Sequence, residues 1–332
     1  MTALPPDGPD RPRRPGASIF TIEGRSAPGL FVVGWLATLI GLGAIVVAFM
    51  AGPGLASAIL LIVGLVVLSV GLVAGAGAQG IERRAHGGRS YVGPSPFLVF
   101  AAAIPISQLV LIGAGVVLVW LGIPVRGPVG TLVSVLFQAV VYIGLVRLLV
   151  VDGGFLSWAD MRIRRPSMPS LVELGLGAGW ALPVIVATIP VALLITQFIP
   201  VLPQSPLPPT GEAVGLALHL AAGMLVAPVS EEILFRGFAT TAWIRDIGVT
   251  RGVVRGALFF ALAHVLTISG DTAGEAVGAA IAAFVGRIPI ALALGWLFVR
   301  RDTIWAPLGL HAAFNGLLVI LQEVAARNVP GV

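Results

Sequence analysis

Residues 30–50, LFVVGWLATLIGLGAIVVAFM, and residues 55–79, LASAILLIVGLVVLSVGLVAGAGAQ, contain no charged side chain. About 20 apolar residues in an α-helix cross the hydrocarbon core of a bilayer, so both stretches are long enough to span a membrane. Seven further apolar stretches follow, each bounded by Gly, Pro or charge: 97–123, 130–151, 171–199, 213–236, 253–268, 276–299 and 303–325. Lipid offers the backbone no hydrogen-bond partner, and the period-two alternation of a barrel is absent. The predicted fold is therefore all-α, a polytopic transmembrane bundle of about eight or nine spanning helices.

The composition agrees with this prediction. Hydrophobic residues make up 57% of the 332 residues and charged residues only 11%, with a mean hydropathy of +1.02. Soluble domains carry about 25% charged residues, so a water-soluble fold could not cover this much apolar surface. The chain has no cysteine, which excludes a disulfide framework, thiolate metal ligands and a cysteine nucleophile.

Three regions are expected along the chain. Residues 1–27 are rich in Pro, Gly and charge, and they predict a disordered cytoplasmic tail. The first apolar stretch after them is too long for a signal-peptide core, so we expect a retained span. Residues 28–212 predict N-terminal transmembrane helices without a readable motif, and their role stays unknown. Residues 213–325 carry the polar groups from which a catalytic helix bundle is predicted.

The arginines predict the orientation in the membrane. If the tail is cytoplasmic, 16 of the 20 arginines fall in cytoplasmic segments, at 11–25, 83–89, 162–165, 236–255 and 300–301. Such asymmetry is what the positive-inside rule describes. The net charge of +5 is then a topology signal, and no nucleic-acid partner is expected. The predicted partners are the lipid bilayer and a membrane-associated peptide or protein substrate.

Polar side chains interrupt three apolar stretches of the last third of the chain. They are Glu231, Glu232 and Arg236 in APVSEEILFRGF, His264, and the pair His311 and Asn315 in APLGLHAAFNG. A charge near the middle of a bilayer costs about 2.5–3.5 kcal/mol on insertion scales, so such groups need a partner or a function. With Arg236, Arg255 and Asp302 as markers of the cytoplasmic interface, Glu231 lies roughly 8 Å inside and both histidines roughly 13 Å inside. Three helices are thus predicted to bring these groups to one layer, where they could meet.

Such a meeting favours hydrolysis. A glutamate in a low-dielectric pocket is a competent general base, and a histidine beside it can hold the attacking water. His311 and Asn315 lie on one helical face and can donate hydrogen bonds to an oxyanion. Glu231, His264 and His311 are also a possible zinc set with an open fourth position. The pattern contains no HExxH, so it does not require a metal, and both mechanisms stay open.

Residues 213–320 resemble the type II CAAX prenyl endopeptidase family, the CAAX proteases and bacteriocin-processing enzymes. The resemblance rests on EExxxR at Glu231–Arg236, FxxxH at Phe260–His264 and HxxxN at His311–Asn315, in that order on spanning stretches. It implies an intramembrane peptidase that cuts a peptide bond within or beside the membrane. With the predicted orientation, we expect the cut on the cytoplasmic side, in the cytoplasmic membrane of a bacterium. The resemblance also implies that Glu231 and His264 activate the water, that His311 and Asn315 stabilise the oxyanion, and that Glu232, Arg236 and Phe260 support them. Family members have been described both as metalloproteases and as glutamate-dependent peptidases.

Two other functions compete with the peptidase. A catalytically silent membrane scaffold or immunity factor would bind without cutting, and a proton-coupled transporter would use the same groups as a relay. The transporter predicts discontinuous helices, repeats and charge near the membrane midplane. Among the other histidines, His219 is expected to be structural and remote from the site.

Overall fold

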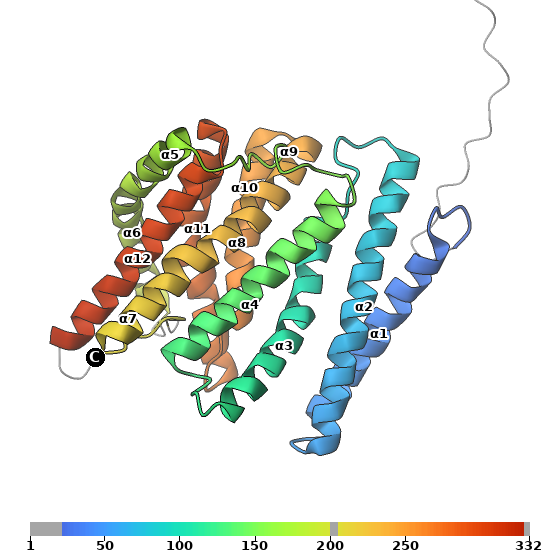
Figure 1. Ribbon diagram of the computed structural model, residues 1–332, viewed down its shortest axis with the longest axis horizontal. Coiled ribbons are helices and arrows are strands. Elements are labelled where there is room, and N and C mark those ends of the chain that lie inside the picture. The colour runs from blue at the N-terminus through green and yellow to red at the C-terminus, as the bar shows by residue number, and fades with distance from the viewer. Residues whose placement is uncertain (1–21, 200–204, 329–332) are drawn as a thin grey trace, which may run out of the picture.

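The computed structural model describes residues 22–199 and 205–328, and within these ranges every regular element is a helix (Figure 1). Within these ranges, nine helices, some made of several consecutive helical segments, are long and apolar enough to cross a membrane. The prediction of an all-α polytopic transmembrane bundle is therefore confirmed. The predicted tail at 1–21, with its arginines 11, 13 and 14, lies outside the described residues.

The nine spans follow the predicted stretches closely. They are α1 (Pro28–Met50), α2 (Leu55–His86), α3 (Pro96–Trp120), α4 (Pro128–Val146) with its continuation Arg147–Val151, α5 (Met168–Gly179) with α6 (Ala181–Phe198), α7 to α9 (Ala213–Ile247), α10 (Val249–Ala263) with the short turn His264–Thr267, α11 (Ala273–Arg301) and α12 (Trp305–Asn328). The sixth span is assembled from α7 (Ala213–Leu220), α8 (Ala227–Glu231) and α9 (Thr241–Ile247), with π-helical segments at Ala221–Val226 and Glu232–Thr240 between them.

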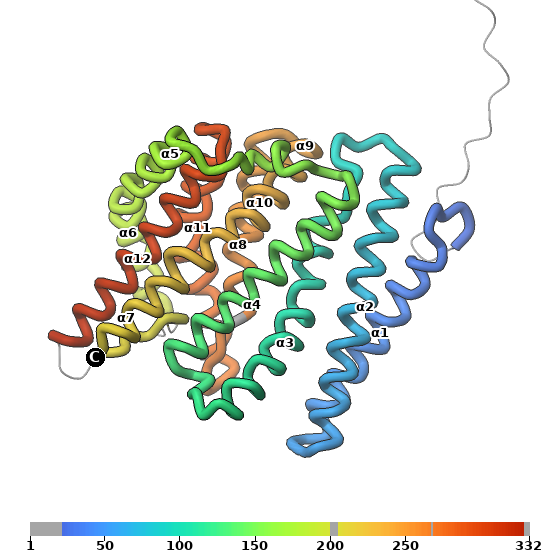
Figure 2. Tube along the Cα trace, in the orientation of Figure 1, coloured from blue at the N-terminus to red at the C-terminus, as the bar shows by residue number. Residues whose placement is uncertain are grey.

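The hairpin of α1 and α2 stands at one side of the bundle and joins it through α3 (Figure 2). Small residues let its two helices approach closely. A methyl group on Gly34 would lie 2.9 Å from Gly75 Cα, so only glycine fits there. Close backbone approach through small residues is the usual way that helices associate in lipid.

The centre of the bundle is an aromatic core around the sixth span. Phe235 packs edge-on against Phe259 and Phe260, with ring centroids 5.4 and 5.2 Å apart, and Phe100 of α3 lies 5.8 Å from it. Nearly all of the π-helical segment Glu232–Thr240 is buried. Figure 1 shows α8 in the middle of the molecule, between α4 and α12. This packing fixes the segment that carries the EExxxR motif.

The sixth span differs from the sequence prediction in its length. It was expected to end at 236, with Arg236 marking the cytoplasmic interface, but the helix continues to Ile247 and Arg236 is only 1% exposed. Arg236 is therefore a buried residue of the span. Glu231 lies 16 residues before Ile247, roughly 24 Å along the helix. The choice of Arg236 as a marker of the interface was wrong, because charge alone cannot distinguish an interfacial arginine from a buried, paired one.

The arginine-rich end of the bundle is held by residues 152–167, here called the strap (Figure 1). Arg162 Nη1 donates to Phe298 O at 2.7 Å and its Nε pairs with Asp302 at 3.0 Å, while Arg245 pairs with Asp160. Hydrogen bonds from the Ser157 backbone and hydroxyl, helped by Arg245, hold the pKa of Asp160 below its usual range. The strap thus ties the α9–α10 turn to the α11–α12 turn.

Candidate active site

Glu231 is the last residue of α8, and the second π-helical segment of the sixth span begins directly after it. Its carboxylate Oε2 is 3.6 Å from His264 Nε2 and 3.8 Å from His311 Nε2. The structure therefore brings together side chains from the sixth span, the end of α10 and α12. Single-turn π-helical insertions in α-helices often occur at functional sites.

His264 follows the last residue of α10 and is held by its own helix. Its Nδ1 lies 2.8 Å from Phe260 O, and its ring is 4.4 Å from the Phe260 ring centroid. A carbonyl oxygen only accepts, so Nδ1 carries the proton in this bond. In the neutral ring, Nε2 is then an acceptor that faces Glu231.

His311 is oriented by Glu232, which the sequence prediction had assigned only to Arg236. Glu232 Oε1 accepts from His311 Nδ1 at 2.8 Å and from Arg236 Nη1 at 2.9 Å. All three side chains are at most 5% exposed. The i,i+4 spacing indicated the bond to Arg236, but it held no information about a partner on another helix. A carboxylate that fixes the tautomer and orientation of a histidine is the arrangement found in catalytic triads.

The Phe260 ring packs against the side chains of the site. Its ring centroid lies 5.6 Å from that of His311, and the Arg236 guanidinium stacks on its face at 4.1 Å. The phenyl ring thus touches both histidines and the buried arginine. It fixes their positions without taking part in hydrogen bonding.

Asn315 lies one turn beyond His311 and bonds to the irregular backbone. Its Nδ2 donates to Gly223 O at 3.0 Å, within the first π-helical segment of the sixth span. The predicted oxyanion donor therefore has one N–H engaged with the protein. The second N–H of the same amide is left for another acceptor.

The exposure of the side chains indicates from where a substrate reaches the site. The side chains of His264 and Glu231 are 25% and 16% exposed, whereas those of His311 and Glu232 are almost fully covered. Glu231 Oε2 itself is buried and makes no hydrogen bond of good geometry within the described ranges. A water or peptide group is therefore expected to approach between Glu231 and His264.

A metal would need a tighter set of ligands. Among residues 22–199 and 205–328, no three or more His, Asp and Glu side chains are arranged to hold a metal ion. In their present positions Glu231, His264 and His311 do not fit zinc, and no step below passes through a metal. Their role as metal ligands stays a prediction.

Two residues near the site were not assigned a role from the sequence. Tyr142 belongs to α4, which packs against α8, and Arg287 belongs to α11, which packs against the segment Glu232–Thr240. Tyr142 accepts a hydrogen bond from Gln138 Nε2 at 2.8 Å, one helical turn earlier. This i,i+4 polar pair inside a spanning stretch was a signal that the sequence carried.

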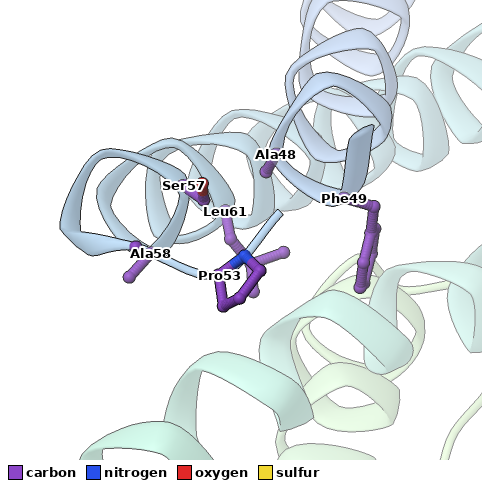
Figure 3. Close-up of a pocket in the computed structure, with 7 residues that line it drawn as sticks. Ala48, Phe49, Pro53, Ser57, Ala58 and Leu61 are labelled. Carbon is purple, nitrogen blue, oxygen red and sulfur yellow. The ribbon is translucent and has the colours of Figure 1, made fainter. Parts of the chain in front are cut away.

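His219 lies away from the site, as expected for a structural residue. It is in α7, 12 residues before Glu231, which is roughly 18 Å along the helix, and its charged neighbour is Glu323 near the end of α12. An apolar hollow at the α1–α2 turn is also unrelated to the site (Figure 3). The side chains that line it include Ala48, Phe49, Pro53, Ser57, Ala58 and Leu61. Among these six, only Ser57, through its hydroxyl, has a side chain that could donate or accept a proton in hydrolysis.

Comparison with known proteins agrees with this geometry. Residues 213–317, about a third of the chain, match the family described as type II CAAX prenyl endopeptidase, Rce1-like. The match begins at the first residue of α7 and ends in α12, so it includes Glu231, His264, His311 and Asn315. No curated protein and no solved structure matches the chain.

Proposed function

We propose, from the premise that residues 213–317 form an Rce1-like CAAX endopeptidase domain, that this integral membrane protein hydrolyses a peptide bond with Glu231 as general base. The observation that carries the proposal is the meeting of Glu231 with His264 and His311 at 3.6 and 3.8 Å, from three helices of that domain. The substrate is a peptide or protein segment that lies in or beside the membrane.

The first step is attack by water. A water between Glu231 and His264 donates one hydrogen to the Glu231 carboxylate and the other to His264 Nε2, so its lone pair is directed at the substrate carbonyl carbon. As the new C–O bond forms, Glu231 takes one proton of the water. The carbonyl oxygen becomes an oxyanion.

The oxyanion needs donors on the other side of the carbonyl. The free N–H of Asn315 is one of them. His311 is the second in its imidazolium form, because its Nδ1–H is already donated to Glu232 and only the charged ring has an Nε2–H as well. Glu232 accepts the Nδ1–H and so holds the ring in this orientation.

The second step is breakage of the C–N bond. The oxyanion collapses to a carbonyl, and the protonated Glu231 gives its proton to the leaving nitrogen. The products are a carboxylic acid, which ionises, and an amine, and Glu231 returns to its carboxylate form. Protons and electrons balance without a cofactor.

The orientation in the membrane is part of the proposal. The arginine-rich end of the bundle, which holds Arg83, Arg84, Arg164, Arg300 and Arg301, faces the cytoplasm of a bacterial cell, so the N-terminus is cytoplasmic. His311 lies six residues from the start of α12 at that end, roughly 9 Å along the helix. With this orientation, we propose that cleavage takes place on the cytoplasmic side of the membrane.

The proposal is tested with Glu231→Gln, which keeps the shape of the side chain and removes the proton acceptor. Membrane-fraction peptides from cells carrying the variant or the unchanged chain are compared by mass spectrometry. Activity should fall by at least about a hundredfold, the scale of general base catalysis. His86→Ala, at an exposed residue of α2, is the control and should cleave normally. If no product depends on Glu231 although both proteins are well expressed, the scaffold function is favoured.

The glutamate mechanism also predicts independence from metals. Protein dialysed against a strong chelator should keep its activity. Elemental analysis of the same sample should find fewer than about one metal ion per ten chains, an order of magnitude below the content of a filled site. Loss of activity that returns on adding zinc would assign Glu231, His264 and His311 to a metal instead.

The transporter remains the second candidate, because the π-helical segments make the sixth span irregular on both sides of Glu231. A transporter would move protons or solute in sealed vesicles whether or not a peptide is cut. Cleavage that is lost in Glu231→Gln, without any flux in vesicles of the unchanged chain, separates the two functions.

A further inference from the structure

Arg287 is a charged residue in the middle of a spanning helix. It lies 14 residues from either end of α11 (Ala273–Arg301), which is roughly 21 Å along the helix in each direction. Half of the hydrocarbon core is only about 15 Å thick. A lipid headgroup therefore cannot serve as the partner of this guanidinium.

The side chain is on the protein-facing side of α11. Ala283, Ala291 and Leu294, which precede and follow it at helical spacing, are all buried. The Arg287 side chain is partly buried, and its Nη1 donates to Ala283 O of its own helix at 3.0 Å. Arg287 thus points into the bundle and not into lipid.

No carboxylate in the described part of the chain lies within ion-pair distance of Arg287. Arg236 shows what a satisfied arginine in this bundle looks like, with Glu232 at 2.9 Å and the Phe260 face at 4.1 Å. Intramembrane arginines are normally paired or functional, so Arg287 calls for an anion from outside the chain.

The helix that carries Arg287 lies against the elements that carry the reacting groups. It packs against the turn His264–Thr267 and against the π-helical segment Glu232–Thr240. An anion bound to the free side of the guanidinium would therefore lie among the helices that form the site.

We propose that Arg287 binds a carboxylate of the peptide substrate and so selects which bond is cut. This inference rests on the proposed function, because a peptide is what supplies the ligand. A carboxylate is the only anion that an unmodified peptide carries, and the planar guanidinium binds it through two parallel hydrogen bonds. The carboxylate comes either from the C-terminus of the substrate or from an Asp or Glu side chain near the cut.

Another explanation is that Arg287 only balances the charge of Glu231. Removing Arg287 would then change the pH profile of cleavage equally for all peptides. Binding of a carboxylate makes a different prediction, because the effect of removing Arg287 depends on whether the substrate has that carboxylate.

The first measurement is independent of cleavage. Purified protein in detergent is heated with N-dodecanoyl-valine or with its C-terminal amide, and the unfolding temperature is followed. The acid should raise the unfolding temperature of the unchanged chain, and the amide should not. Arg287→Met should abolish the shift, while Arg147→Met, at an exposed arginine in another span, should keep it. Equal shifts in the unchanged chain and Arg287→Met would overturn the inference even if the protein is a peptidase.

The second measurement uses cleavage and separates the two sources of the carboxylate. Peptide mixtures with free C-termini, with amidated C-termini, and with amidated C-termini plus internal Glu are incubated with each variant, and products are identified by mass spectrometry. The unchanged chain should prefer one carboxylate-bearing mixture over the plain amidated one by about 10- to 100-fold, the scale of a charge-assisted hydrogen bond. Arg287→Met should lose that preference and Arg287→Lys should keep part of it. A preference that survives in Arg287→Met contradicts the inference alone. A complete lack of cleavage by the unchanged chain contradicts both the inference and the proposed function.

Discussion

At the scale of single residues, the two adjacent glutamates have different tasks. Glu231 faces the two Nε2 atoms and its side chain is 16% exposed, whereas Glu232 is fully buried and bonds Arg236 and His311. Their neighbouring positions on a helix point the side chains in directions about 100° apart, so one carboxylate reaches the reaction and the other reaches the groups behind it. The pair is thus a base and an orienting group made from two consecutive residues.

This division of tasks predicts the behaviour of Glu232→Gln. The single substitution should destabilise the protein by about 3–5 kcal/mol, because Arg236 is left buried without a counterion. The double variant Glu232→Gln/Arg236→Met removes both charges and should recover most of that stability.

Activity separates the two roles of Glu232. Because His311 has lost its orienting carboxylate, the double variant should still be at least about tenfold less active than the unchanged chain. Unfolding in detergent and cleavage rate are measured on the same preparations. A double variant that recovers stability and activity together would show that Glu232 only neutralises Arg236.

At the scale of the elements, α4 lies outside the family match and packs directly against α8, the helix that carries Glu231. α4 also packs against the π-helical segments of the sixth span, and it presents Gln138 and Tyr142 on one face. The role of the N-terminal helices was left unknown from the sequence. No motif indicates the contact of α4 with α8, because it joins segments that are far apart in the sequence. α4 therefore supplies polar groups to the site from a part of the chain that carries no motif.

Tyr142→Phe tests that contribution by removing a single oxygen atom. The ring still packs against Phe100, whose centroid is 6.2 Å away, so the fold should be kept. The phenol accepts from Gln138 and keeps its own proton to donate, on a helix that packs against α8. We predict that its loss lowers the cleavage rate by about tenfold, the scale of one hydrogen bond to a charged group.

The other tyrosine of the chain is a matched control. Tyr91 is buried in the loop before α3 and donates to Pro94 O at 3.0 Å, and burial raises its pKa well above the usual range. Tyr91→Phe should lower stability by about 1 kcal/mol and leave the rate unchanged. Equal rates for Tyr142→Phe and the unchanged chain would show that α4 has only a packing role.

The sequence predicted helices better than it predicted their ends. Apolar length and the absence of charge defined the spans, since both follow from the thickness of the bilayer. The end of the sixth span at Ile247 could not be read, because Arg236 looks like an interfacial residue until its buried partner Glu232 is known. The bond from Asn315 to Gly223 was also hidden, since it depends on a π-helical segment that has no sequence signal.

At the scale of the whole molecule, an odd number of spans fixes the relation between the chain ends. With nine spans, the N-terminal end of α1 and the C-terminal end of α12 lie at opposite faces, and Figure 1 shows them at opposite ends of the bundle. Once one face is assigned, all connecting segments follow. The arginines make that assignment. Most of them lie at one end of the bundle, which is formed by the α2–α3 connection, the strap, the α9–α10 turn and the α11–α12 turn (Figure 1).

The assignment is tested by cysteine labelling, which has no background because the chain has no native cysteine. His86→Cys marks the end of α2, and Val125→Cys marks the α3–α4 connection at the opposite face. Both positions are exposed, so a membrane-impermeant maleimide can reach either one from the side on which it lies. In intact cells residue 125 should be labelled and residue 86 should not, and opening the membrane should make both react. Asn328→Cys, at the last residue of α12, should behave like residue 125, because the nine crossings found among the described residues place it outside. Labelling of residue 86 alone in intact cells would reverse the orientation, and the proposed cytoplasmic position of the Glu231 site would be reversed with it.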